Sequence, residues 1–185
     1  MLKNKVTEFL SSLSPDELKR FGEFISSSYF NKNLNAVKLF KELRKHYPDF
    51  SERTLSNEYL YKKVISNKGY NMQVIRNLNS SLMKLAKDFL AVEKLFDNET
   101  DKSLSLLAKL QEKKLGSFFN SELKDLEDSL LKKDDLTHST FLNLHRMESE
   151  RLNFLIENDR QNEAVDYILK QSEYLVFHFL IHLSN

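Results

Sequence analysis

The chain's five histidines include one pair with the spacing of helical metal ligands. His178 and His182, in HFLIH, are four residues apart, so a helix would project both side chains from one face. The stretch lacks the glutamate that acts as general base in H-E-x-x-H enzymes, and no third ligand is marked. We therefore predict a packed or interfacial histidine pair and no metal site.

Other chemistries have no supported candidate. His145 and Glu148 have the reverse order of the Glu-x-x-His motif of di-iron bundles, which also needs more carboxylates. No serine lies in G-x-S-x-G or S-x-x-K with the strand-to-helix context that such nucleophiles need, and Gly22, Gly69 and Gly116 cannot build a phosphate loop. The absence of cysteine excludes thiolate catalysis, disulfides and cysteine-bound metal. We predict no catalytic residue and no cofactor, so the protein is not expected to be an enzyme.

One constellation could contact nucleic acid. Residues 51–96 read as a short helix, a turn around Gly69 and a long helix, the order of a helix-turn-helix. Arginine and asparagine can read base edges, whereas lysine and serine can hold phosphates. The alternative is a lysine-rich face that contacts only water. The candidate residues on the polar face of the long helix are Arg76, Asn77, Ser80, Lys84 and Lys87.

The stretch SSSYFNKN, residues 26–33, is predicted to connect two helices of a hairpin. Tyr29 and Phe30 can pack the corner, Asn31 tolerates left-handed geometry, and Asn33 can cap the following helix. The functional alternative is a polar loop, anchored by its aromatic residues, that touches a partner.

Helical periodicity runs through the whole chain. Ser14 and Glu17 predict a capping box that opens a helix. No segment alternates as a strand does, and Gly and Pro together number only five. We expect an all-α fold of antiparallel helical hairpins, packed as a bundle or a short solenoid-like array of about eight helices. The expected helices span 2–13, about 15–26, 34–46, 56–65, 71–96, 101–114, 118–133, 137–157 and 161–183.

Two helices have distinctive apolar patterns. From Ile75 to Phe96, apolar residues repeat with spacings of three and four, which predicts a seam buried inside the fold or against a second copy. Residues 174–183 are apolar on almost every face. That composition predicts a helix buried on all sides, either at the centre of the fold or in a longer protein.

Charge divides the chain near DNET, residues 97–100. Residues 1–96 carry a net charge of +7 and residues 97–185 a net charge of −6. Either the basic half binds an anion or the two halves attract each other. We predict a basic helical region at 1–96 and an acidic one at 97–185 packed on it, with one continuous core.

The sequence also suggests a compartment. The N-terminus lacks an apolar core with a cleavage site, so no signal peptide is expected. No stretch of eighteen apolar residues occurs, so no membrane contact is expected. Together with the lack of cysteine, these features favour the cytoplasm.

Residues 13–50 carry a recognisable pattern. It reads L-S-x-x-E-L-K-R-F, then Y-F-N-K, then L-F-x-x-L-x-K-x-Y-P-x-F. The pattern resembles the N-terminal region of large, uncharacterised helical proteins of Bacteroidota and their relatives. The resemblance implies a cytoplasmic bacterial protein and no particular activity.

Shorter stretches resemble two other classes. Residues 55–85 resemble the winged-helix modules of bacterial transcription activators. Residues 35–48 and 160–175 resemble helices of tetratricopeptide-type hairpins. We predict a non-enzymatic helical module that binds a protein partner, with a DNA-binding regulator as the alternative and a homo-oligomer left open.

Overall fold

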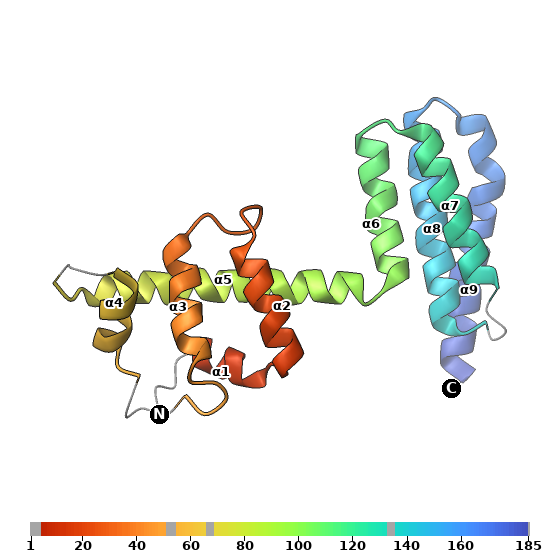
Figure 1. Ribbon diagram of the computed structural model, residues 1–185. Coiled ribbons are helices and arrows are strands. Elements are labelled where there is room, and N and C mark those ends of the chain that lie inside the picture. Colours follow the sequence, from red (N-terminus) through yellow and green to blue (C-terminus); the bar gives the residue numbers. More distant parts are fainter. Residues whose placement is uncertain (1–4, 51–54, 66–68, 133–135, 185) are drawn as a thin grey trace. The chain divides into compact units, whose positions relative to one another are not determined.

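The computed structural model describes residues 5–50, 55–65, 69–132 and 136–184. These residues form nine α-helices and one 3-10 turn and contain no strand (Figure 1), which confirms the all-α prediction. None of the described helices is long and apolar enough to cross a membrane. The chain divides into two compact units, Met1–Lys94 and Leu95–Asn185.

The first unit packs four shorter helices against one long helix. Helices α2 and α3 lie side by side and cross the long helix α5 (Figure 1). Ser14 and Glu17 form the predicted capping box at the start of α2, and Asn33 caps α3 as predicted. The bounds are α1 Lys5–Ser12, α2 Pro15–Ser26, α3 Leu34–Arg44, α4 Asn57–Ile65 and α5 Met72–Phe96.

Aromatic packing holds the centre of this unit. Phe21 is fully buried, and its ring centroid lies 5.2 to 5.3 Å from those of Phe9, Phe40 and Phe89. The seam of α5 from Ile75 to Phe89 belongs to the same core. That stretch of the seam is therefore internal rather than a face for a second copy.

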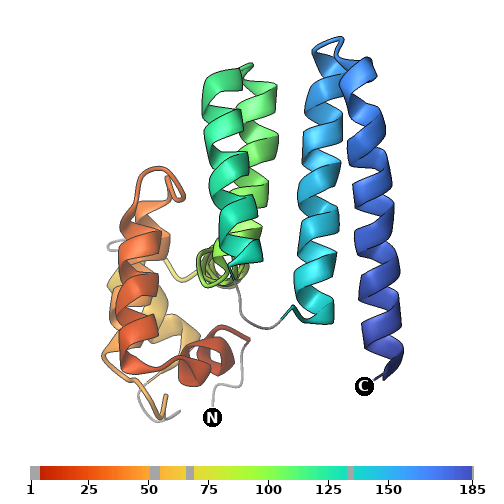
Figure 2. The same cartoon turned by 90° about the vertical axis from the view of Figure 1, so that its right-hand side faces the viewer.

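The second unit consists of two antiparallel hairpins, α6 with α7 and α8 with α9 (Figure 2). Its largest core cluster includes Leu107, Leu130 and Leu144, and the rings of Phe119 and Phe154 stack at 4.1 Å. The bounds are α6 Glu99–Glu112, α7 Gly116–Leu131, α8 His138–Glu157, η1 Gln161–Glu163 and α9 Ala164–Ser184.

Several details differ from the sequence predictions. Within each unit buried side chains form their own clusters, and the predicted packing of the two halves around one core stays a prediction. The last helix is not buried at the centre of this chain's fold, because Ala164 is the only described residue of α9 that is buried; burial within a longer protein stays a prediction. The predicted turn at 66–70 and the corner at 132–136 fall partly on 66–68 and 133–135, outside the described residues.

Candidate functional site

The loop at residues 26–33 is held in place by its own hydrogen bonds. The Asn31 side chain donates to the carbonyl of Ile25 at 2.8 Å and accepts from the amide of Asn33 at 2.8 Å. Asn31 does not use the left-handed geometry that asparagine tolerates, since its φ is not positive. The side-chain hydrogen bonds of Asn31 stabilise the loop without a residue in the left-handed conformation.

The two aromatic residues of the loop have different roles. Phe30 stacks on Phe24 with ring centroids 4.1 Å apart, which anchors the loop to the core. Tyr29 packs edge-on against Phe30 at 5.0 Å and is 87 % exposed. The loop therefore presents a tyrosine ring to solvent on a fixed support.

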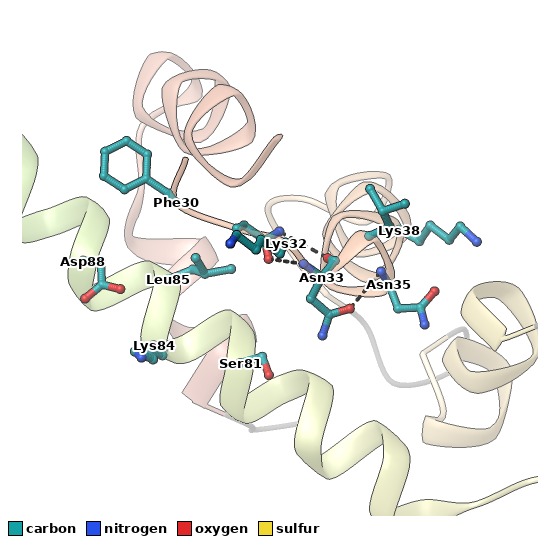
Figure 3. Close-up of a pocket in the computed structure, with 11 residues that line it drawn as sticks. Phe30, Lys32, Asn33, Asn35, Lys38, Ser81, Lys84, Leu85 and Asp88 are labelled. Carbon is teal, nitrogen blue, oxygen red and sulfur yellow. Dashed lines mark hydrogen bonds between the residues drawn. The ribbon is translucent and has the colours of Figure 1, made fainter. Parts of the chain in front are cut away.

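This loop forms one wall of a groove in the first unit (Figure 3). The opposite wall is α5, and the space between them has a volume of about 790 Å³. Leu34 and Leu85 supply apolar surface, while three lysines and one aspartate supply charge. The charged lining residues are Lys32, Lys38, Lys84 and Asp88.

The lysines of the groove have no ion-pair partner among the described residues. Lys32, Lys38 and Lys84 form no ion pair with any residue that the structure describes. Lys84 also lines a second hollow of about 470 Å³, together with Lys5 and Lys87. An excess of positive charge beside exposed apolar groups suits a ligand that carries carboxylates and an apolar side chain.

The five residues predicted to contact nucleic acid all lie on α5. Arg76, Asn77, Ser80, Lys84 and Lys87 are exposed, on the side of the helix opposite its buried seam. Asn77 accepts a hydrogen bond from the Gln73 side chain at 2.8 Å, so its oxygen is already engaged. Helical periodicity is sufficient to predict this exposed stripe of α5. It does not predict that Lys84 lines the same groove as Lys32 and Lys38.

Histidines gather where α8 begins and α9 ends. The ring of His138 lies 5.7 Å from that of His178 and 5.3 Å from that of His182. His178 Nδ1 lies 2.7 Å from the backbone oxygen of His138. No group of His, Cys, Asp or Glu in the described ranges is placed to hold a metal ion. Sequence spacing gave no signal for His138.

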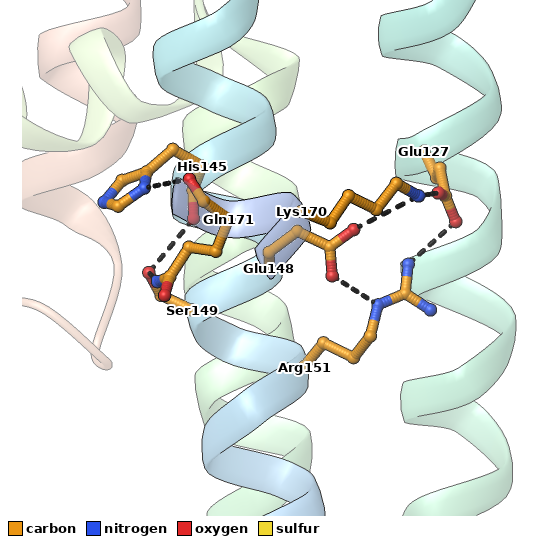
Figure 4. Close-up of polar contacts among 7 residues, drawn as sticks. All are labelled: Glu127, His145, Glu148, Ser149, Arg151, Lys170 and Gln171. Atoms are coloured by element: carbon orange, nitrogen blue, oxygen red, sulfur yellow. Dashed lines mark hydrogen bonds and ion pairs between the residues drawn. The ribbon is translucent and has the colours of Figure 1, made fainter. Parts of the chain in front are cut away.

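His145 and Glu148, which the sequence analysis set aside as a metal pair, contact different partners. His145 Nδ1 lies 3.0 Å from the backbone oxygen of Gln171 on α9, whereas Glu148 accepts from Arg151 Nε at 2.7 Å (Figure 4). Arg151 also donates to Glu127 at 2.7 Å, and Lys170 donates to Glu127 at 2.8 Å. These four charged residues, Glu127, Glu148, Arg151 and Lys170, are called the ion network below.

Burial separates the two carboxyls of the ion network. Glu148 is fully buried, and desolvation raises its pKa against the opposing attraction of Arg151 and Lys170. Burial also acts to raise the pKa of Glu127, but hydrogen bonds from Lys170 and Arg151 outweigh it and lower that pKa. The network connects α7, α8 and α9 through ion pairs, and we interpret its role as structural.

Comparison with known proteins adds no assignment. The chain matches no protein-family model, no curated protein and no solved structure.

Proposed function

We propose that the protein is a non-enzymatic interaction module whose first unit binds an acidic protein segment in the groove between residues 26–33 and α5. The observation that carries the proposal is the groove lined by Lys32, Lys38 and Lys84, which form no ion pair with any described residue. Tyr29 is exposed on the same loop, and the residue after it, Phe30, lines the groove. Tyrosine contributes a large contact area at low entropic cost, and lysines favour an acidic partner. Given the resemblance of residues 13–50, we propose that it acts in the bacterial cytoplasm.

Dimensions support a peptide rather than a large flat partner. The groove has a volume of about 790 Å³ and is open to solvent along its length, so a segment of chain could lie in it. It accommodates one or two anchoring side chains, while carboxylates on either side would meet Lys32, Lys38 and Lys84. The chemistry expected of the segment is therefore an apolar anchor flanked by aspartate or glutamate.

A random peptide library displayed on phage tests this proposal. Selection on the wild-type chain should enrich peptides that combine acidic residues with one aromatic or aliphatic anchor. Fluorescence anisotropy of a selected peptide should then show that Lys84→Glu and Tyr29→Ala each weaken binding about tenfold or more.

The matched control is Lys94→Glu. Lys94 is exposed on α5 and lines neither hollow, so this variant has the same change in net charge as Lys84→Glu. It should bind the peptide as the wild type does. If Lys84→Glu and Lys94→Glu lose equal peptide affinity, the effect comes from overall charge and not from the groove. Enrichment of peptides without acidic residues would contradict the proposal.

A second candidate is duplex DNA, favoured by the alignment of Arg76, Lys84 and Lys87 along one exposed side of α5. Labelled mixed-sequence duplex should then bind with an affinity that falls steeply with salt, because neutralised phosphates release counterions. The variant Arg76→Glu/Lys84→Glu/Lys87→Glu should lose that binding with its circular dichroism unchanged. No binding at low salt would eliminate this candidate.

A further inference from the structure

Helix α9 packs a mixed side of polar and aromatic residues on α8 and turns an apolar side outward; the ring of Phe177, for example, lies 5.2 Å from that of Phe141 on α8. Towards α8 it presents Gln171, which donates to Ser149 Oγ at 2.6 Å, and His178, next to the backbone of His138. On its outer side, eight large apolar residues are each 46 to 67 % exposed. These residues, called the outer face of α9, are Val165, Ile168, Leu169, Leu175, Val176, Phe179, Leu180 and Leu183.

The spacing of the outer face is that of a helix seam. Positions 165, 168, 172, 175 and 179 follow one another at intervals of three and four. Leu169, Val176 and Leu183 repeat every seven residues beside them. This pattern lets one helix pack lengthwise against another, with side chains interlocking in turn.

The outer face carries no charge. The charged residues of α9 are Asp166, Lys170 and Glu173, and all three lie off the seam. Lys170 is engaged with Glu127 of its own chain. When two copies pack the same face together, identical residues come close, so any charge on the seam would meet a like charge. The outer face has no charged residue, so the outer faces of two copies can pack together without charge repulsion.

The size of the outer face matches a dimer interface. With full residue surfaces of roughly 150–250 Å², the exposed fractions amount to on the order of 800 Å². Stable interfaces bury about 800 Å² per partner, whereas the largest patch on a monomer is about 300–600 Å². A lipid surface fits less well, because interfacial helices are rich in lysine and arginine and α9 has only Lys170.

We propose that the outer face of α9 is the interface of a homodimer, in which the α9 helices of two copies pack along each other. This interface lies in the second unit and does not depend on the groove of the first unit. Dimerisation would cover the apolar residues that a single chain leaves in water.

Sedimentation equilibrium of the whole chain tests the dimer. The wild type should show twice the chain mass of 21.8 kDa. Phe179→Glu should raise the dimer dissociation constant roughly a hundredfold or more, because like charges would then be buried together. The matched control is Phe118→Glu on α7, since Phe118 is 64 % and Phe179 58 % exposed in the same unit. That control should remain dimeric.

A crosslink provides a readout that does not rely on a disruptive substitution. Since the chain has no cysteine, Ser172→Cys places a single thiol at the middle of the seam. A short bismaleimide should join two such chains, while Glu173→Cys, one residue off the seam, should crosslink far less. A wild type that stays monomeric at high concentration would overturn the proposal and would leave another part of the chain or another protein to cover this face. A dimer that survives Phe179→Glu and crosslinks equally at both positions would also overturn it.

Discussion

Removing the Arg151 guanidinium should strongly destabilise the second unit. In Arg151→Met, the fully buried Glu148 loses its hydrogen-bonded partner at 2.7 Å and keeps only Lys170, whose Nζ lies 3.5 Å from Oε1. Breaking one side of a buried ion pair costs about 3–5 kcal/mol. Glu148 can limit that cost by taking up a proton, so we expect about 3 kcal/mol at pH 7.

The loss of unfolding free energy in Arg151→Met should become smaller as pH falls. The folded-state pKa of Glu148 is already raised, and loss of Arg151 raises it further. Between its unfolded and folded pKa values, the folded variant binds more protons than the unfolded chain. The free energy of unfolding should therefore recover as pH falls, by up to about 1.4 kcal/mol per pH unit, and decline as pH rises towards the folded pKa.

Urea unfolding followed by circular dichroism measures the change, and hydrogen exchange with mass spectrometry assigns it to residues 95–185. The double variant Glu148→Leu/Arg151→Met leaves no buried carboxylate without its partner, so it should be more stable than Arg151→Met alone. Arg160→Met serves as the control, because Arg160 pairs with Glu163 at the surface of the same unit and should show no measurable change. A cost below about 1 kcal/mol for Arg151→Met, or a double variant less stable than the single one, would refute the reasoning.

Three further predictions concern the first unit. Phe21→Ala should lower the free energy of unfolding, measured in urea titrations, by about 3–5 kcal/mol, because its ring is fully buried among three others. A loss below about 1 kcal/mol would mean that the cluster is not closely packed. Ser14→Ala should cost about 1 kcal/mol at pH 7 by removing the cap of α2, and an unchanged midpoint would contradict the capping box. Hydrogen bonds from Lys45 and then Tyr59 lower the pKa of Glu42, so Tyr59→Phe should raise it in an NMR titration. An unchanged pKa of Glu42 in Tyr59→Phe would show that the Tyr59 hydrogen bond does not lower it.

Local sequence accounts for most of the helices. Capping at Ser14 and Asn33 and the apolar seam of α5 are confirmed, because caps and periodicity involve residues within one or two turns of each other. The exposed stripe of Arg76, Lys84 and Lys87 follows from the same periodicity. Its role in binding remains a prediction.

The ion network could not be predicted from spacing. Glu148 and Arg151 are neighbours on α8, but Glu127 and Lys170 come from α7 and α9, so the association depends on how three helices pack. His145 and Glu148 are three residues apart and could share one face of a helix. Packing separates those two side chains and directs His145 towards the backbone of Gln171.

The sequence by itself determined which segments are helical, where several of them begin, and which half of the chain is basic. These properties arise from backbone capping, side-chain periodicity and composition, all of which act locally. Only the tertiary structure decided that residues 30–38 and α5 border a groove and which side of α9 faces α8. Composition predicts burial of α9 on all sides, but Gln171 and His178 make hydrogen bonds with α8 that the apolar residues cannot make. Those bonds leave the outer face of α9 exposed for a second copy, as proposed above.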